Sequence, residues 1–141
     1  MSTNHFLLFT DGASRGNPGQ AGAGVVLAGP DGRVICCAKK YLGICTNNEA
    51  EYKALNIGLE TALKEKFHNL NIYLDSELVV RQIEGVYKIK NTRLSELSRE
   101  TKRLLSFLDS YSIRHIPRKE NAEADRLANE AIDNHLSRDP V

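Results

Sequence analysis

The sequence lacks the features that would place it in a membrane or in a secreted, disulfide-rich protein. No apolar run approaches the roughly 18 residues that a membrane-spanning helix needs, and no basic segment followed by a long apolar stretch opens the chain. The three cysteines, Cys36, Cys37 and Cys45, are an odd number and have no C-x-x-C or Cys/His ligand spacing. We therefore expect a cytoplasmic protein in a reducing compartment, without membrane association or an obligatory protein partner.

An excess of charge of one sign is also missing. Nineteen Lys and Arg residues face eighteen Asp and Glu residues, a net charge of +1, so that any binding of a polyanion must come from local clusters. There is no internal repeat, low-complexity tract or linker. The 141 residues, 41% hydrophobic and 26% charged, predict one domain over residues 1–141, with a core over about 5–135 and a flexible tail over 136–141.

Hydrophobic periodicity predicts an α/β protein of order β-β-β-α-β-α-α-β-α, with an antiparallel meander at its start. The first apolar run is read as a short strand that ends before the breakers Gly12 and Gly16. The predicted strands cover residues 5–10, 21–28, 33–42, 69–74 and 111–116. The predicted helices cover residues 47–66, 76–83, about 94–108, and the stretch from about residue 121.

Three aspartates occupy notable positions, and each has a structural alternative. Asp11 ends the first predicted strand, where Asp-Gly is a common turn pair. Asp75 ends the strand over 69–74, where it could cap the next helix. Asp125 lies in the first turn of the last helix, where the helix dipole favours a negative charge. None of the three indicates a function by itself.

Two glutamates near the start of the first helix have different roles. Thr46 and Glu49 have the T-x-x-E spacing of a capping box, which gives Glu49 a structural task. Glu51 lies two residues further, about 200° around the helix, on the side that faces the core. A carboxylate at this position has no capping role.

If the first and fourth strands are neighbours, Asp11 and Asp75 meet at one end of the sheet, and Glu51 and Asp125 can approach the same rim. Two carboxylates about 4 Å apart repel by about 4 kcal/mol at an effective dielectric constant of about 20. Such a cluster predicts bound cations, and an all-oxygen site favours Mg²⁺ or Mn²⁺ over Zn²⁺. Paired ions of this kind are typical of in-line attack on a phosphodiester.

Five segments, in the same order, resemble the ribonuclease H family, type 1, over roughly residues 5–135. The family's fold is ribonuclease H-like: a five-stranded mixed sheet, three antiparallel strands followed by parallel ones, flanked by helices. The resemblance is carried by TDGASRGNPG (residues 10–19), GAG-VV (22–26), TNNEAEY (46–52), YLDSELVVRQIEG-YK (73–88) and PRKENAEADRLANEA (117–131).

The resemblance implies an endoribonuclease that hydrolyses the RNA strand of RNA–DNA hybrids with two Mg²⁺ ions, leaving 5′-phosphate and 3′-hydroxyl ends. By motif, Asp11 would contact both ions. Asp125 would help to hold the ion that activates water, and Glu51 and Asp75 the ion that stabilises the leaving oxygen. The alternatives are a nuclease of the same fold that cleaves RNA–RNA duplexes, and a non-catalytic hybrid-binding module.

The resemblance also implies substrate contacts that read sugars and groove shape rather than base sequence. The candidates are Gly12, which would let the backbone approach the RNA, and Asn17, Thr46, Asn47 and Asn48. Helix capping is the structural alternative for Asn47 and Asn48.

Two features of the family are missing from the sequence. The loop over residues 117–123 has no counterpart of the mobile histidine that many relatives carry before the last aspartate, and Arg118 is the candidate substitute. The basic protrusion is reduced to Lys88 and Lys90, which predicts weaker and steeply salt-dependent hybrid binding.

Overall fold

The structure, a computed structural model, describes residues 5–137. It contains one five-stranded mixed sheet. The strand order is β3-β2-β1-β4-β5; β1, β2 and β3 pair antiparallel, and β4 and β5 continue parallel to β1. This confirms the predicted meander and mixed sheet. The strands are β1 (Phe6–Gly16), β2 (Gly19–Ala28), β3 (Val34–Cys45), β4 (Asn69–Leu74) and β5 (Ser110–His115).

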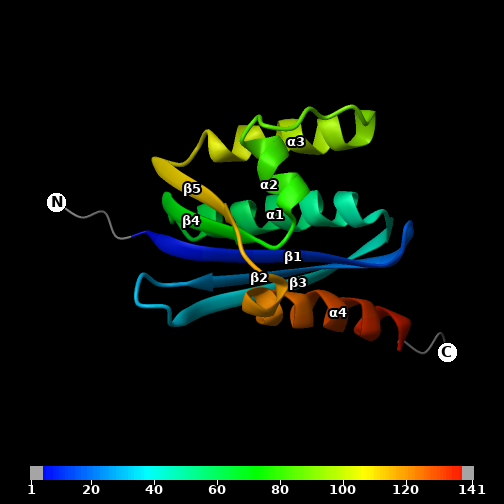
Figure 1. Cartoon of the computed structure of the whole chain (residues 1–141). Coiled ribbons are helices and arrows are strands. Elements are labelled where there is room, and N and C mark those ends of the chain that lie inside the picture. The colour runs from blue at the N-terminus through cyan, green and yellow to red at the C-terminus, as the bar shows by residue number, and fades with distance from the viewer. Residues whose placement is uncertain (1–4, 138–141) are drawn as a thin grey trace.

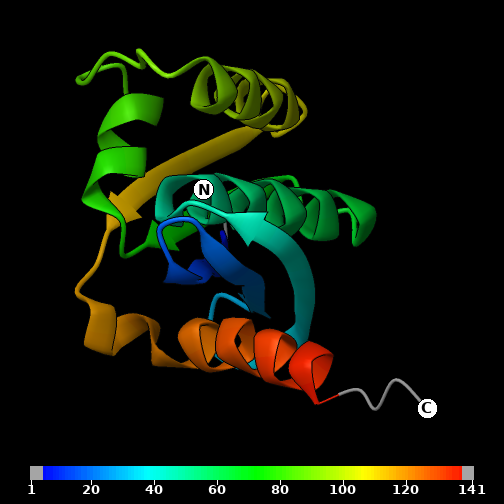
Figure 2. The same ribbon diagram turned by 90° about the vertical axis from the view of Figure 1, so that its right-hand side faces the viewer.

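Helices cover both faces of the sheet. One face carries α1, on which α3 packs, and α4 covers the other face (Figures 1 and 2). The predicted tail begins inside α4, whose last residue is Leu136, and residues 138–141 lie outside the described range. The helices are α1 (Asn47–Lys64), α2 (Glu77–Ile83), α3 (Thr92–Leu105) and α4 (Ala122–Leu136), the last preceded by the short 3₁₀ turn η1 (Arg118–Asn121).

The first helix begins where the capping pattern predicts. The Thr46 hydroxyl accepts a hydrogen bond from the Glu49 backbone N–H (3.2 Å), and the Glu49 carboxylate accepts one from the Thr46 N–H (2.9 Å). This reciprocal pair satisfies two of the N–H groups that a helix start leaves free. The apolar side of α1 then packs on the main core, which includes Leu8, Val25, Leu55, Leu59, Leu70 and Ile72.

The first strand is longer than predicted. It does not end at Asp11 but continues to Gly16, because the antiparallel pairing with β2 runs on to Gly16 opposite Gly19. The parallel pairing with β4, in contrast, ends at Phe9 opposite Tyr73. The reading of Asp11-Gly12 as a turn pair was therefore wrong: Asp11 is a mid-strand residue that lies just beyond the end of its parallel neighbour.

On the opposite face, α4 approaches the sheet closely because β2 offers glycines there. A Cβ atom on Gly22 would lie 2.2 Å from the Ala128 carbonyl oxygen, and one on Gly24 would lie 2.0 Å from that of Ala124. This contact fixes the first turn of α4 beside β1 and β2. Asp125 is thereby held near the same end of the sheet.

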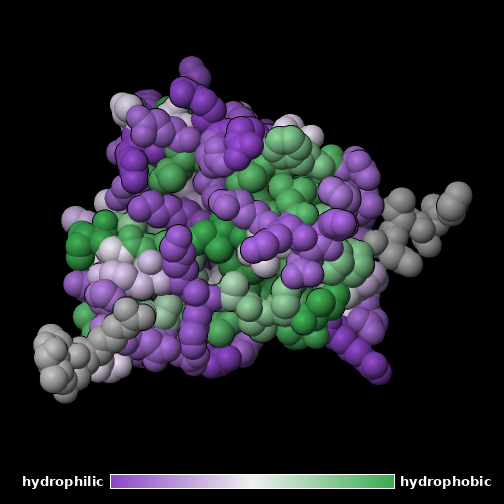
Figure 3. All heavy atoms as spheres, turned by 180° about the vertical axis from the view of Figure 1, so that it is seen from behind, coloured by the Kyte–Doolittle hydropathy of each residue, from purple (hydrophilic) through white to green (hydrophobic). Residues whose placement is uncertain are grey.

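The surface mixes polar and apolar side chains. The face turned away from the viewer in Figure 1 carries hydrophobic patches bordered by hydrophilic residues (Figure 3). The edge strand β3 exposes large apolar side chains, among them Val34 and Ile35. Within residues 5–137, no helix combines the length and the apolar character needed to cross a lipid bilayer.

Candidate active site

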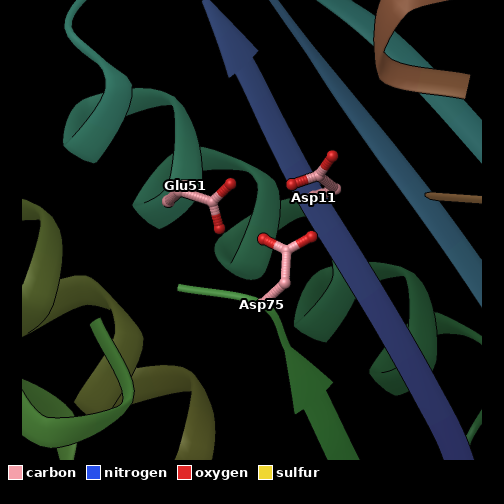
Figure 4. A group of neighbouring side chains, drawn as sticks. All are labelled: Asp11, Glu51 and Asp75. Atoms are coloured by element: carbon pink, nitrogen blue, oxygen red, sulfur yellow. The ribbon is translucent and has the colours of Figure 1, made fainter. Parts of the chain in front are cut away.

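Three carboxylates from three different elements converge at one end of the sheet. One carboxylate oxygen from each of Asp11, Glu51 and Asp75 lies within 4.8 Å of the other two. Their side chains point toward one another from β1, α1 and the end of β4 (Figure 4). The predicted meeting of Asp11, Asp75 and Glu51 is confirmed in its geometry.

The position of Asp11 follows from strand alternation. Phe9 packs against the cluster of Val26, Ala124 and Leu127 on the α4 side of the sheet, and alternation places Asp11 on the same side. The pairing of β1 with β4 ends at Phe9, so no residue of β4 lies beside Asp11. Glu51 of α1 can therefore approach the Asp11 carboxylate from the other side of the sheet. It is the most central of the acids and is only 5% exposed.

Glu51 is buried in the first turns of α1, where capping does not need it. Its Oε1 accepts a hydrogen bond from the Gly12 N–H (2.9 Å). Its Oε2 is buried and has no hydrogen-bond partner among the described residues. A Cβ atom on Gly12 would lie 2.2 Å from the Ala50 carbonyl, so the glycine is needed for the approach of α1. The packing of α1 thus requires that this residue has no Cβ.

Asp75 follows β4 directly and does not cap the next helix. That task belongs to Ser76, whose hydroxyl accepts a hydrogen bond from the Val79 N–H (3.3 Å). The structural alternative for Asp75 is therefore wrong, and its carboxylate is left to face Asp11 and Glu51.

The cluster is electrostatically unfavourable when no cation is bound. Burial, the hydrogen bond with Glu51 and the negative charges of Glu51 and Asp75 all raise the pKa of Asp11 far above its ordinary value. Burial also raises the pKa of Glu51, with further contributions from the charges of Asp75 and Asp125, although the Asp11 and Gly12 hydrogen bonds oppose the shift. Asp11 and Glu51 are therefore more stable when they are protonated or bind a cation than when both are ionised and unpaired.

The donor set fits hard divalent cations. All the candidate ligands are carboxylate oxygens, and no Lys or Arg in the described part of the chain forms a salt bridge with Asp11, Glu51 or Asp75. The unpartnered Oε2 of Glu51 supplies a buried oxygen that a cation would satisfy. Oxygen ligands without nitrogen or sulfur suit Mg²⁺ or Mn²⁺ rather than Zn²⁺.

The fourth predicted acid lies on the wall of the same cleft but outside the tight group. Asp125 and the three clustered acids line a cleft of about 480 Å³. The Asp125 Oδ1 accepts a hydrogen bond from the Asn129 side-chain amide (3.2 Å), one helical turn further along α4. Arg118 reaches the same oxygen only weakly, at 3.8 Å, and is largely exposed. Asp125 adjoins Asp11 and helps to raise its pKa.

The predicted substrate residues divide between two neighbouring hollows. Gly12, Asn47, Asn48 and Arg118 line the acidic cleft. Thr46 and Asn17 line an adjoining hollow of about 310 Å³, which shares Asn48 with the cleft.

The capping alternatives can be assigned around this hollow. Thr46 caps α1, so Asn47 and Asn48 are not its caps. The Asn17 Oδ1 accepts a hydrogen bond from the Asn47 N–H (3.0 Å), which ties the turn after β1 to the start of α1.

Two asparagines of the site were missed in the sequence. Asn129 was detectable, since it lies four residues after Asp125 and so shares a helix face with it. Asn121 was read only as the start of the last helix, although its amide donates to the Asp75 carboxylate (3.3 Å). No local pattern signals that contact, because it joins residues 46 positions apart.

Comparison with known proteins agrees with this geometry. The family model described as Reverse transcriptase-like matches residues 9–131. The crystal structure of RNase H1 from Halobacterium salinarum matches with a TM-score of 0.90 at 40% identity, over 92% of this chain and 98% of that one. This chain belongs to the ribonuclease H family. The ribonuclease H fold predicted from the sequence motifs is thereby confirmed.

Named members of the ribonuclease H family are similar over most of this chain. The protein named Ribonuclease HI of Halobacterium salinarum is 42% identical over 125 residues, which are 89% of this chain and 63% of that protein. The chain thus spans less than two thirds of this relative's length. The crystal structure of LC11-RNase H1 in complex with an RNA/DNA hybrid has a TM-score of 0.89 at 40% identity, and the match covers 94% of this chain and 99% of that one.

Proposed function

We propose that this ribonuclease H family member is an endoribonuclease that hydrolyses the RNA strand of RNA–DNA hybrids and leaves 5′-phosphate and 3′-hydroxyl ends. The observation that carries the proposal is the convergence of Asp11, Glu51 and Asp75 in a cleft that Asp125 also lines. The hybrid bound by LC11-RNase H1, a relative of the same fold, supports the choice of substrate. A pure binding module would gain nothing from mutually repelling acids that face phosphates.

The four acids would hold two Mg²⁺ ions, for which Mn²⁺ would substitute. When bound, such a pair acts as Lewis acids that activate the attacking water and stabilise the departing 3′-oxygen. Asp11 would contact both ions because it is the central acid. The Gly12 N–H holds Glu51 Oε1 and leaves Oε2 for ligation, and Asn129 likewise holds one oxygen of Asp125.

We propose that the substrate backbone lies along the two hollows. Gly12 would lie close to the RNA beside the acids, and Asn17, Asn47 and Asn48 would contact the sugar-phosphate backbones and the 2′-hydroxyl side of the groove. Thr46 would contact a phosphate of the DNA strand. These groups offer amides and hydroxyls to sugars and phosphates, so cleavage should depend little on base sequence. Arg118, close to Asp125, remains the candidate for the role of the missing loop histidine.

The free state of Cys36, Cys37 and Cys45 supports the further proposal that the enzyme acts in the reducing cytoplasm.

A digestion assay tests the proposed activity. We expect labelled RNA–DNA hybrid to be cleaved in the RNA strand when Mg²⁺ is present, and cleavage to stop when EDTA removes it. Double-stranded RNA and double-stranded DNA, treated side by side, should stay intact. Cleavage of double-stranded RNA at a similar rate would contradict the assigned substrate, and hybrid binding without cleavage would contradict the assigned activity.

Two neighbouring glutamates offer a matched pair of variants. Glu49→Ala removes the capping box and should lower the free energy of unfolding by about 1 kcal/mol, while cleavage persists. Glu51→Gln should abolish cleavage without lowering the stability of the metal-free protein, because it removes a buried charge that Asp75 and Asp125 repel. Chemical denaturation and the hybrid assay on both variants measure the contrast. The same loss of activity in both would contradict the assignment of roles.

A further inference from the structure

Asn121 is a buried polar residue whose position capping does not explain. It is 2% exposed and lies where η1 meets α4, yet its side chain makes no capping hydrogen bond to α4. Instead its Nδ2 donates to the Thr10 backbone carbonyl (2.9 Å) and to the Asp75 Oδ2 (3.3 Å). The residue thus links the start of α4 to β1 beside Asp11 and to the end of β4.

Both acceptors of this amide lie at the acid cluster, because Thr10 directly precedes Asp11 and Asp75 is one of the three acids. A primary amide has two N–H groups, enough for one hydrogen bond to each acceptor. The Asn121 Oδ1 is buried without a partner in the described part of the chain. Because an unpaired buried acceptor is unfavourable, the two donated bonds must set the orientation of this side chain.

The contact with Asp75 suits a ligand-positioning role. Asp75 is partly exposed at a strand end, and Asn121 is the one side chain in residues 5–137 that donates to its carboxylate. A neutral amide fixes the direction of a carboxylate without neutralising it, whereas Lys or Arg would compete with a cation. Groups that hold ligand side chains in this way commonly change metal affinity about 10–100-fold when they are removed.

We propose that Asn121 is a positioning residue, which orients the Asp75 carboxylate toward Asp11 and Glu51 and so preforms the divalent-cation site. This inference rests on the proposed function in one respect only, namely that the acids bind divalent cations. It concerns the affinity of the site for the ion and not the identity of the nucleic acid.

The test compares two buried asparagines. Asn121→Leu replaces the amide by an apolar side chain of the same branching, and Asn56→Leu makes the same change at a buried amide that bonds Leu97 and Thr101 instead. Both variants should lose thermal stability. We expect Asn121→Leu alone to bind Mn²⁺ about 10-fold more weakly by isothermal titration calorimetry. Raised Mn²⁺ should then restore part of the cleavage rate of this variant, but should not change that of Asn56→Leu.

A measurement on the wild-type protein removes the dependence on a folded variant. In ¹H–¹⁵N spectra, the side-chain amide signals of Asn121 should shift as Mg²⁺ is added, while those of Asn56 stay in place. Unchanged Asn121 signals, or wild-type Mn²⁺ affinity in Asn121→Leu, would overturn the inference alone. A wild-type protein that binds neither ion would overturn both the inference and the proposed function.

Discussion

Asp11→Asn is expected to abolish hybrid cleavage, with a loss of at least about 1,000-fold, equivalent to about 4 kcal/mol of transition-state stabilisation. Asp11 is the central member of the acid cluster and is only 5% exposed. An asparagine of the same shape keeps one carbonyl oxygen but loses the charge that would hold the ions. The rate of hybrid cleavage at saturating Mg²⁺ measures the loss.

The same variant should be at least as stable as the wild type when divalent ions are absent. Burial raises the pKa of Glu51 from 4.5 to about 7, so between these values the folded protein binds more protons than the unfolded chain. The free energy of unfolding of the metal-free wild type must then fall as the pH rises through this range. Burial and the neighbouring acids raise the pKa of Asp11 as well, so Asp11 adds a penalty of the same sign. The asparagine removes this titrating group, so the advantage of the variant should grow toward pH 7.

Urea denaturation at several pH values, with EDTA present, checks this stability. Asp109→Asn is a suitable control, because Asp109 is an exposed acid remote from the cleft lining and should change neither activity nor stability. If Asp11→Asn were strongly destabilised, Asp11 would be a structural residue of the strand. If it kept cleavage within about tenfold of the wild type, the metal-site assignment of Asp11 would fail.

The sequence predicted most of the fold because the fold rests on local patterns. Alternating residues marked β4, and the Thr46–Glu49 spacing marked the start of α1. The same spacing gave Glu49 a structural role in capping. Glu51, two residues further, has no such role and could therefore be identified as the site residue. Asp75 follows β4, and Asp11 lies just beyond the end of the pairing between β1 and β4, so their convergence was predictable once the two strands were taken as neighbours.

What the sequence could not predict depends on contacts between distant segments. Gly12 was read as a strand breaker because glycine usually interrupts a strand, but pairing with β2 carries β1 through it. Asn121 was read as a helix start because its acceptors, Thr10 and Asp75, lie far away in the chain. Such residues become recognisable only when the packing of α1 and α4 on the sheet is known.

Gly12→Ala is the second variant for which we expect a large effect. The new Cβ would lie 2.2 Å from the carbonyl carbon and oxygen of Ala50 and 2.5 Å from the Glu51 nitrogen. These are backbone atoms of α1, which cannot rotate away, so β1 and α1 must separate. We expect a loss of about 3 kcal/mol or more in the free energy of unfolding, measured by urea denaturation.

This separation should also reduce catalysis in the molecules that remain folded. The Gly12 N–H bonds Glu51 Oε1 at 2.9 Å, so a displacement of β1 moves Glu51 away from Asp11. A shift of about 1 Å in a catalytic group can cost about 100-fold in rate, and we expect a loss of that size below the melting temperature of the variant.

Gly32→Ala is the control for Gly12→Ala. Gly32 has a positive φ of 86°, but no atom lies within 4 Å of the new Cβ. This substitution should cost about 1 kcal/mol through backbone strain and leave cleavage unchanged. Equal effects of the two substitutions would show that lost backbone freedom, rather than the contact between β1 and α1, explains the requirement for Gly12.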